Sequence, residues 1–365
     1  MTHKATPIPS KMFFITIIRK LKYVLLTGLF LLLIAMISIS ITRRSSYTIQ
    51  TNGKLYIVNK HSRSITVFDL LKGKEITEFP LEIEPHEATT LFGQNKVIIT
   101  NYGTHNVIGK TISIINTASN KVEKTIELEE SLRPHGIVAF PYANKVGVVT
   151  NKGNELLVVN LETGIIEKKI PTQQVVSQLL VLHPTKPLAF VSNISSGSVS
   201  VIDLVKDKVI KVISCGKGTE GLDITPGGKE IWVTNTEENT ISIINTNTFK
   251  VTKTLSAGKE PLRLKFSIDG KYCLVTNSDD GTISVYNSYS KKQIKTICIP
   301  GKKGLIERAL YHTPRPGGIL MHPNGLYAFI SNSNANKIEV IDMQTFTLVS
   351  TIGTGKVPDG LTFVE

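Results

Sequence analysis

One sequence phrase recurs seven times between residue 47 and residue 365. It consists of an apolar run that ends in Asn, mostly after Thr or Ser, then a short turn, a second apolar run that ends in Asp or Asn, and a Lys-rich run. The asparagines that end the first run are Asn59, Asn101, Asn151, Asn193, Asn235, Asn277 and Asn332, at spacings of 42, 50, 42, 42, 42 and 55 residues. A period near 42 with several β-branched runs predicts four-stranded propeller blades, because one such sheet cannot bury its own faces. Seven repeats predict an all-β, seven-bladed β-propeller over residues 51–365.

Residues 219–256 give the expected order of strands within one blade. Glu220–Thr225 is expected as the inner strand, and the runs EIWVTN, TISIINT and KVTKTLS as the second, third and fourth strands. Apolar and small residues alternate within these runs, as in strands that pack between neighbouring blades.

The two ends of the chain are expected to share the first blade. In the regular repeats a Pro lies 16 residues before the strand-ending Asn, as Pro85 does before Asn101. The last such step, Pro358, is followed by only seven residues, 359–365, and the nine missing residues are found at Thr51–Asn59. We therefore expect Gly360–Val364 to be the inner strand of this blade, so that N- and C-terminal strands close the ring and remove exposed sheet edges.

A stretch of nineteen residues without a charge, Tyr23–Ile41, precedes the repeats. As a helix it is long enough to cross a hydrocarbon core of about 30 Å, so we expect residues 23–42 to be a transmembrane signal-anchor. Five basic residues precede it and two arginines follow it, which by the positive-inside bias puts residues 1–22 in the cytoplasm. We expect a single-pass protein of the cell membrane, with a linker at residues 43–50 and an extracytoplasmic propeller.

The alternative is a cleaved signal peptide, in which Ser38 and Ser40 would be the small residues at the −3 and −1 positions. The apolar stretch is longer than the usual core of a signal peptide, and no Cys follows it as a site for lipid attachment. We therefore favour the uncleaved anchor, which makes the cell membrane a partner of residues 23–42.

The formal charge of +13 does not indicate a nucleic-acid partner. Residues 1–46 hold seven Lys or Arg and no acidic residue, which leaves 35 basic and 29 acidic residues for the rest of the chain. An excess this small, without a dense basic run, argues against nucleic-acid binding.

The chain has three cysteines, Cys215, Cys273 and Cys298, each among apolar or β-branched neighbours. An odd number rules out a fully paired disulfide framework, and no CxxC pair suggests zinc ligands. We expect all three to be small packed side chains.

The repeat phrases resemble those of the YVTN-repeat β-propeller family. The resemblance covers residues 47–365 and lies in second strands such as KVGVVTN, EIWVTN and YCLVTN, third strands such as TISIINT and SVSVIDL, and fourth strands such as KVIKVI and KVTKTL. It implies the propeller fold and a likeness to surface-layer, adhesion and periplasmic binding proteins, and more distantly to the propellers of amine dehydrogenases, haem-binding nitrite reductases and sugar lactonases. Several of those rely on another subunit, a modified residue or a bound haem for catalysis, and none is visible in this sequence. The resemblance therefore does not by itself imply an enzyme, and no cofactor is predicted.

Three departures from the period mark one face of the propeller. The loop NYGTHNVIGKT of the second blade is five residues longer than its counterparts, the link ELEESLRPHG is three longer, and the link PGKKGLIERALYHTPRP before the last blade is thirteen longer. Loops from second to third strand and links from blade to blade open on the same face of a propeller. Because binding residues on a rigid scaffold lie in its loops, we expect this face to bind the ligand.

The residues that begin the inner strands are expected to surround the solvated mouth of the central channel on that face. The residues just after the Pro step are Asp359, His86, His135, Gln178, Glu220, Leu262 and Gly317. Ionisable residues one or two positions away are Glu87, Arg133, Arg263 and Arg315. All of these except Leu262 and Gly317 are candidate ligand-binding residues. The alternative is that they only line a water-filled channel.

His86, His135 and Asp359 come from three consecutive blades. Two imidazoles and a carboxylate are a workable set of ligands for zinc or another transition ion, so these three residues are the candidate metal ligands.

Other histidines divide between the two faces. His105 in the second-blade insertion and His312 in the last insertion are further candidates for ligand contacts. His183 and His322 lie in His-Pro steps at the opposite face, where we expect only a role in turns.

Two classes of function remain open. The first is a binding or interaction module outside the cell that recognises a protein, a wall polymer or a small ligand. The second is an enzyme, either a lactonase-like hydrolase or a cofactor-dependent redox protein, with His86, His135, Glu87 and Arg263 at the channel mouth. The sequence has no phosphate-binding glycine loop, GxSxG elbow or HExxH helix, so we favour the binding module, acting as a monomer, and assign no catalytic residue. Convergence of the four side chains around a pocket would favour the enzyme.

Overall fold

The structure, a computed structural model, describes residues 19–31, 46–91, 93–141, 143–301 and 313–365. The chain divides into two units, residues 1–44 and residues 45–365. Residues 19–31 of the first unit form a helix, and within the described residues no helix has the length and apolar character needed to cross a membrane. The predicted anchor at residues 23–42 extends over residues 32–42, which lie outside the described part of the chain. The anchor therefore stays a prediction.

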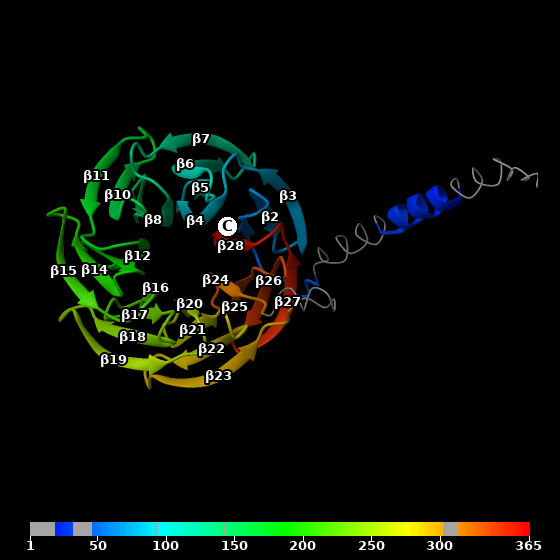
Figure 1. Cartoon of the computed structure of the whole chain (residues 1–365). Coiled ribbons are helices and arrows are strands. Elements are labelled where there is room, and N and C mark those ends of the chain that lie inside the picture. Colours follow the sequence, from blue (N-terminus) through cyan, green and yellow to red (C-terminus); the bar gives the residue numbers. More distant parts are fainter. Residues whose placement is uncertain (1–18, 32–45, 92, 142, 302–312) are drawn as a thin grey trace, which may run out of the picture. The chain divides into compact units, whose positions relative to one another are not determined.

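In the described part of the second unit, 28 strands form seven antiparallel sheets of four strands each. Figure 1 shows these sheets as blades arranged around a common axis, with the inner strands closest to it. Blade 1 combines β28 with β1, β2 and β3, and blades 2 to 7 follow in chain order from β4 to β27. The predicted all-β, seven-bladed propeller with four-stranded blades is confirmed.

Strands at the same position of each blade have similar lengths. The inner strands are β28 (Pro358–Val364), β4 (Pro85–Leu91), β8 (Pro134–Ala139), β12 (Ser177–Leu182), β16 (Thr219–Ile224), β20 (Pro261–Phe266) and β24 (Pro316–Met321). The second strands are β1 (Lys54–Asn59), β5 (Lys96–Gly103), β9 (Lys145–Thr150), β13 (Leu188–Asn193), β17 (Glu230–Asn235), β21 (Tyr272–Asn277) and β25 (Tyr327–Asn332). The third strands are β2 (Ser64–Asp69), β6 (Ile108–Asn116), β10 (Glu155–Asn160), β14 (Ser198–Asp203), β18 (Thr240–Asn245), β22 (Thr282–Asn287) and β26 (Lys337–Asp342). The fourth strands are β3 (Lys74–Pro80), β7 (Lys121–Glu127), β11 (Ile166–Pro171), β15 (Lys208–Ser214), β19 (Lys250–Ser256), β23 (Lys292–Cys298) and β27 (Thr347–Gly353).

The C-terminal strand closes the ring by pairing with the first strand of the propeller. β28 runs antiparallel to β1, with Val364 opposite Lys54 and Leu361 opposite Ile57. It begins at Pro358, two residues before the predicted start of the inner strand. The predicted shared blade is therefore confirmed, and the ring has no unpaired inner edge at the chain ends.

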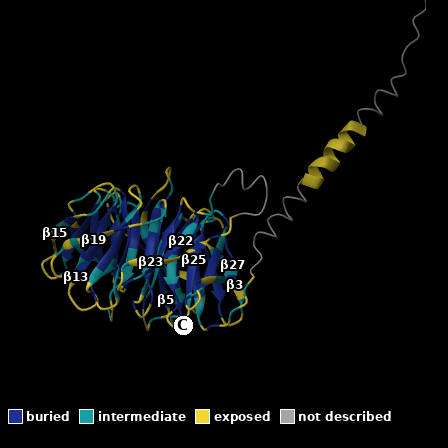
Figure 2. Cartoon of the chain, turned by 90° about the horizontal axis from the view of Figure 1, so that it is seen from below, coloured by how far each residue is buried: buried dark blue, intermediate teal, exposed yellow. Residues whose placement is uncertain are grey.

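The hydrophobic core consists of separate layers between neighbouring blades. Seven clusters of buried side chains occur in the described residues, and each joins two adjacent sheets. Between blades 5 and 6, for example, Trp232 contacts Phe266 and Tyr286 edge to face, with ring centroids 5.4 and 6.1 Å apart. Figure 2 shows the buried residues in the strands and the exposed residues mainly in the loops at both faces. Each blade therefore depends on both neighbours for the burial of its two faces.

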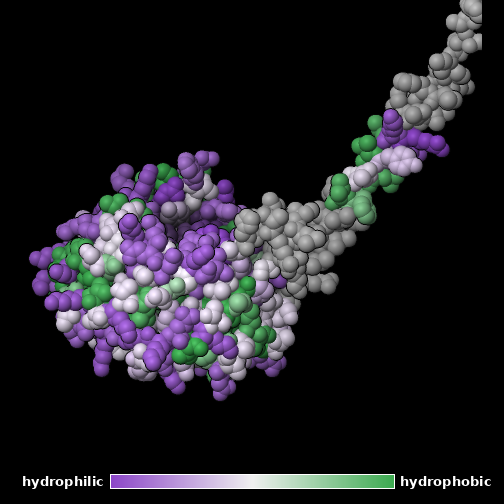
Figure 3. All heavy atoms as spheres, turned by 60° about the horizontal axis from the view of Figure 1, so that its bottom comes forward, coloured by the Kyte–Doolittle hydropathy of each residue, from purple (hydrophilic) through white to green (hydrophobic). Residues whose placement is uncertain are grey.

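The outer surface explains the Lys-rich runs of the repeat. They form the fourth strands at the rim, where Lys250 and Lys253 of β19 are exposed while Leu255 is buried. Figure 3 shows a mostly hydrophilic surface on the visible side of the propeller, with hydrophobic residues in scattered places.

The Asn that ends a second strand joins it to the third strand of the same blade. The side-chain amide of Asn235 donates to Thr240 Oγ1 at 2.9 Å and to Ser242 Oγ at 3.0 Å. The Thr or Ser before the Asn reaches the next blade, as Thr276 Oγ1 donates to the carbonyl of Gly317 at 3.1 Å. Amide contacts of the same kind are made by Asn59, Asn101, Asn193 and Asn277. The repeated (Thr/Ser)-Asn pair thus joins strands within a blade and between blades.

Blade 3 departs from this pattern, and the predicted alignment is wrong there by one residue. The position opposite the start of the third strand is Thr150, which pairs with Glu155, as Asn235 pairs with Thr240 in blade 5. Asn151 lies one residue beyond the strand. The strand KVGVVT is followed rather than ended by Asn, so the sequence spacing alone assigned the wrong residue.

The Asp or Asn that ends a third strand caps the turn that follows. Asp69 Oδ1 accepts hydrogen bonds from the backbone N–H groups of Leu71 and Lys72, at 3.1 and 2.9 Å. Short polar side chains that accept from the backbone two and three residues ahead favour such turns. The same pair of contacts is made by Asn116, Asn160, Asp203, Asn245, Asn287 and Asp342.

The three cysteines differ in burial. Cys273 is buried, as predicted, and Cys215 is half-buried. Cys298 is exposed at the end of β23, so its predicted packing was wrong, because the last residue of that rim strand faces outward.

Glu339 of blade 7 occupies a position that holds a hydroxyl in five other blades. Its side chain is buried, its Oε1 accepts from the Asn332 amide at 2.9 Å, and its Oε2 is a buried atom without a hydrogen-bond partner in the described residues. Burial raises the pKa of Glu339, although the Asn332 hydrogen bond and the charge of Lys337 act in the opposite direction. Ionised Glu339 therefore lowers the stability of the folded state.

We predict that Glu339→Gln raises the free energy of unfolding by about 1 kcal/mol at pH 7, because the neutral amide removes a buried negative charge. Since the folded pKa is raised, the wild-type chain regains stability as the pH falls through it, and the difference should vanish below the ordinary value of 4.5. Melting temperatures between pH 4 and 8 test this, with the exposed Glu162→Gln as control. A variant that is less stable than wild type at pH 7 would contradict the prediction.

Candidate functional site

The starts of the inner strands and the ends of the second strands lie on one face, called here the insertion face. Just after a second strand, a backbone N–H donates to the carbonyl of the residue before the inner strand of the same blade. Lys60 N donates to Val357 O at 2.9 Å in blade 1, and Ser278 N donates to Glu260 O at 2.8 Å in blade 6. The β5–β6 loop and the links between blades open on this same face.

Glycines let the starts of neighbouring inner strands approach closely. A Cβ on Gly360 would lie 2.5 Å from the carbonyl oxygen of His86, and one on Gly221 would lie 2.8 Å from the Cα of Arg263. Both distances are too short for a side chain. Glu87 of β4 is equivalent in position to Gly360 of β28, and Arg263 of β20 is equivalent to Gly221 of β16. The long side chains of Glu87 and Arg263 therefore begin where neighbouring inner strands lie close together.

Two histidine rings pack against each other, with their planes tilted by 41°, at the starts of β4 and β8. The ring centroids of His86 and His135 are 3.9 Å apart, and Tyr102 packs against both rings at 5.2 and 5.5 Å. His86 and His135 are 6% and 4% exposed. The predicted solvated mouth is therefore wrong for these residues: the neighbouring blade and Tyr102 cover them.

Arg263 connects opposite sides of the ring. Its guanidinium donates to Glu220 Oε1 of blade 5 at 2.6 Å and to Glu87 Oε1 of blade 2 at 3.3 Å. Burial opposes its charge, but the carboxylates of Glu220, Glu87 and Asp359 raise the pKa of Arg263 above its usual value. Because blades 2 and 6 do not adjoin, this contact crosses the axis and narrows the channel at this level.

Asp359 and Lys60, both from blade 1, complete the arrangement. Lys60 Nζ donates to His86 Nε2 at 2.9 Å and lies 3.3 Å from Asp359 Oδ2. Burial acts to raise the pKa of Asp359, but His86, Lys60 and Arg263 outweigh it and hold that pKa below its usual value. The seven residues Lys60, His86, Glu87, His135, Glu220, Arg263 and Asp359 are called the channel-mouth cluster below.

The electrostatics of the cluster keep His135 neutral. Burial lowers the pKa of His135 well below its ordinary value, and the positive charges of Arg263 and Lys60, together with His86, act in the same direction. The Nδ1 atoms of His86 and His135 are buried and have no hydrogen-bond partner among the described residues. The nearest polar atoms to His86 Nδ1 are carboxylate oxygens of the cluster, Asp359 Oδ2 at 3.4 Å and Glu87 Oε1 at 3.6 Å.

Three predicted site residues lie beside the channel-mouth cluster rather than in it. Arg315 donates to both carboxylate oxygens of Glu260, at 2.8 and 3.0 Å, and is exposed. Arg133 lies over the Tyr102 ring, 4.9 Å from its centroid. Gln178 accepts from the Asn151 amide at 3.1 Å. Both arginines precede an inner strand, which explains why their side chains reach the links rather than the axis.

Lys60 and Tyr102 were missed by sequence reasoning. Each directly follows a strand-ending Asn, Asn59 and Asn101. Only the residues after the Pro step were aligned around the ring, whereas the ends of the second strands reach the same mouth. Aligning the residues after the strand-ending asparagines would have found both.

The other histidines agree in part with their predicted roles. His183 Nδ1 accepts from the backbone of Lys186 at 3.0 Å, and His322 Nδ1 accepts from the backbone of Asn324 at 3.1 Å, so both serve turns as predicted. His105 is exposed on the β5–β6 loop. His312 lies outside the described residues.

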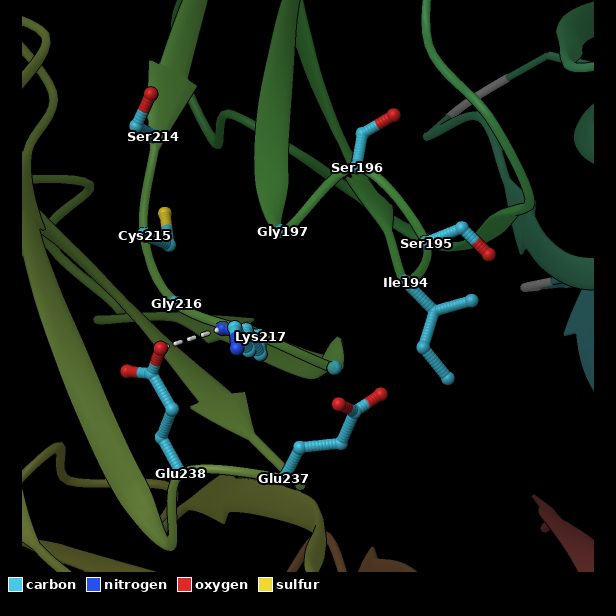
Figure 4. A pocket seen from close by; sticks show the side chains of 11 residues that line it. Ile194, Ser195, Ser196, Gly197, Ser214, Cys215, Gly216, Lys217, Glu237 and Glu238 are labelled. Carbon is cyan, nitrogen blue, oxygen red and sulfur yellow. Dashed lines mark hydrogen bonds between the residues drawn. The ribbon is translucent and has the colours of Figure 1, made fainter.

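A separate pocket of about 500 Å³ opens between blades 4 and 5 on the insertion face. Figure 4 shows Ser195, Ser196, Lys217 and the two acidic side chains of Glu237 and Glu238 around it. The backbone of Lys217 donates to Glu238 at 3.0 Å. Burial raises the pKa of the Cys215 thiol in its wall to about 12, so this thiol is not a nucleophile at neutral pH.

The fold and the channel-mouth cluster define a β-propeller protein with a buried polar site at one mouth of the ring. A family model described as cytochrome D1 heme domain matches residues 84–306, more than half of the chain. The chain belongs to this family. The finer YVTN-repeat resemblance stays a prediction.

Curated relatives and solved structures agree with the propeller fold. Protein YncE of Salmonella typhimurium (strain LT2), described as uncharacterized, is 29% identical over 133 residues, which are 36% of this chain and 37% of YncE, and YncE of Salmonella typhi matches equally. The match thus spans little more than a third of these relatives. A functionally unknown protein from Desulfotomaculum acetoxidans DSM 771 has a TM-score of 0.71 at 16% identity, covering 86% of this chain and 99% of that chain. Hydrazine synthase of Kuenenia stuttgartiensis has a TM-score of 0.67 at 15% identity, covering 79% and 92%. At these identities the structures show the fold alone.

The side chains at the mouth do not fit the haem that the family description implies. The centroids of the His86 and His135 rings are 3.9 Å apart, which leaves no room for a planar ring between them. On the axis, the contact of Arg263 with Glu87 at 3.3 Å occupies the space that a tetrapyrrole would need. The nitrogen ligands are present, but the cavity is filled by side chains of this chain.

Proposed function

We propose that this protein is a membrane-tethered, extracytoplasmic binding module that takes its ligand at the channel-mouth cluster on the insertion face. The single observation that carries the proposal is the convergence of five charged groups, three buried and two half-buried, with two buried histidines at that one place. Buried charges and unsatisfied imidazoles lower stability unless they are fully paired, so their concentration at one mouth points to a binding role. The ligand is a small ion or molecule, because the cluster lies within the ring.

The carboxylates of the cluster support a positively charged ligand. Glu87, Glu220 and Asp359 converge on the same place, where Arg263 and Lys60 contact them. Three carboxylates at one place stabilise a bound cation and repel an anion.

A redox role is the second candidate, and the family match supports it. The side chains of His86, His135, Glu87 and Arg263 also converge, which is the geometry expected of an active site. A ligand at the mouth that can be reversibly reduced would favour this role over simple binding. No observation favours a lactonase-like hydrolase.

The binding site is tested by replacing one carboxylate at the mouth and one at the opposite face. We predict that full-length protein purified under mild conditions retains a small ligand or ion, and that Glu87→Gln weakens its retention at least about tenfold, because this carboxylate is at the centre of the cluster. Native mass spectrometry and elemental analysis of the same samples measure this. Glu230→Gln is the matched control, since Glu230 also forms an ion pair, with Lys291, but at the opposite face. Equal retention by all three proteins would contradict the proposal.

The membrane anchor rests on the uncharged stretch at residues 23–41 and on the basic residues before it. We predict that protease added to intact cells or spheroplasts digests the propeller, while about the first twenty residues stay protected inside. Detection of N- and C-terminal tags after digestion measures this. Release of a soluble protein that begins near residue 41 would instead identify a cleaved signal peptide.

A further inference from the structure

We propose that His86, His135 and Glu87 bind one divalent transition-metal ion of the zinc class directly, with Asp359 as the fourth ligand. This inference rests on the proposed function, since it names the ligand of the channel-mouth cluster. It differs from the haem of the family description, because the protein side chains hold the ion themselves.

The first argument is the spacing of the ligand atoms. His86, Glu87 and His135 each offer one ligand atom, and these atoms all lie within 4.8 Å of one another. His86 Nδ1 lies 3.4 Å from Asp359 Oδ2 and 3.6 Å from Glu87 Oε1. Hydrogen bonds are shorter than this, whereas ligands bound at 2.0–2.2 Å around a tetrahedral zinc ion lie about 3.3–3.6 Å apart. The two distances from His86 Nδ1 therefore match the spacing of ligand atoms around one ion.

The second argument is the unsatisfied nitrogens. Nδ1 of His86 and Nδ1 of His135 are buried without a hydrogen-bond partner among the described residues. An unsatisfied buried polar atom costs about 1–3 kcal/mol, so two of them at one place require an explanation. A metal ion bound by imidazole nitrogen and carboxylate oxygen removes this cost, and both donor types suit divalent transition ions.

The third argument is the rigid support of the ligands. They come from the neighbouring inner strands β28, β4 and β8, and the backbones of Glu87 and His135 are joined through one hydroxyl. Thr100 Oγ1 accepts from Glu87 N at 3.0 Å and donates to His135 O at 3.0 Å. Tyr102 packs against both histidine rings. The ligand backbones are therefore held in place before any ion binds, as a site with defined geometry requires.

Lys60 competes with the metal ion for the imidazole of His86. It donates to His86 Nε2, which leaves the imidazole proton on Nδ1. Binding of an ion at Nδ1 moves that proton to Nε2, so the Lys60 ammonium must then turn away from His86. Its side chain is 22% exposed and also contacts Asp359, so solvent and this carboxylate are both within its reach. Lys60 therefore weakens metal binding, and its removal should strengthen it.

The test is a titration of the full-length protein in detergent with Zn²⁺ and with Co²⁺ after treatment with a chelator. Competition with a chromophoric chelator gives the affinity for Zn²⁺, and the visible absorption of Co²⁺ reports a tetrahedral site with nitrogen and oxygen ligands. Four proteins are compared: wild type, His86→Asn with His135→Asn, the control His183→Asn with His322→Asn, and Lys60→Met. The control pair is matched, because both histidines are buried and belong to turns at the opposite face.

We expect one ion per chain in the wild type and in the control pair, and at least about a hundredfold loss of affinity in the His86 and His135 pair, since two of four ligands are removed. Lys60→Met should bind about tenfold more tightly, because one nearby positive charge is removed. If the His86 and His135 pair does not fold, the Lys60→Met affinity and the Co²⁺ spectrum still decide the question.

Three results would overturn the inference: no stoichiometric binding by the wild type, equal affinity in the two histidine pairs, or weaker binding by Lys60→Met. The last result would mean that Lys60 takes part in binding an anion. Failure here can be told apart from failure of the proposed function. An organic ligand that is lost from Glu87→Gln, together with absent metal, would exclude the ion but keep the mouth as the binding site.

Discussion

The pairing of β28 with β1 is the contact on which the rest of the propeller depends. It joins residues from the two ends of the propeller, and it covers both the blade 1 to blade 2 and the blade 7 to blade 1 layers of the core. Each layer needs two blades, so an open ring would expose apolar faces on both sides of the gap. The same strand carries Asp359 and Gly360, which place a carboxylate beside His86 and bring β4 close. The strand that closes the ring therefore also supplies part of the site.

Most of the fold follows from the repeat itself. The period predicts the number of blades, and the residues missing after Pro358 predict which ends pair. The side-chain contacts explain why the phrase recurs, since Asn235 and its equivalents hold the third strand, and Asp69 and its equivalents cap the next turn. The prediction fails where one residue breaks the spacing. At Thr150 and Asn151, the phrase has the right letters but a register shifted by one, which the strand pairing reveals and which agrees with the step of 16 residues from Pro134.

The sequence predicts where the site lies in the fold, but it does not predict which side chains of the site contact one another. Alignment of the repeats places His86, His135 and Asp359 at equivalent positions, because the backbone of each blade is nearly the same. It does not show that Arg263 reaches Glu87 on the far side of the axis, since that depends on side-chain length and on the absence of side chains at Gly221 and Gly360. Nor does it show burial. The histidines are covered by Tyr102 and approached by Lys60, two residues that belong to a different position of the repeat.

The central claim, that the closing strand both completes the ring and builds the mouth, is tested most directly by thermal unfolding of a chain that ends at Val357. The account predicts loss of cooperative unfolding, or aggregation, in this chain, because β1 then presents a free edge and two core layers lose residues. Asp359→Asn in the full-length chain is the control, and it should unfold cooperatively like wild type. A shortened chain that melts cooperatively at the temperature of the full-length protein would contradict the account.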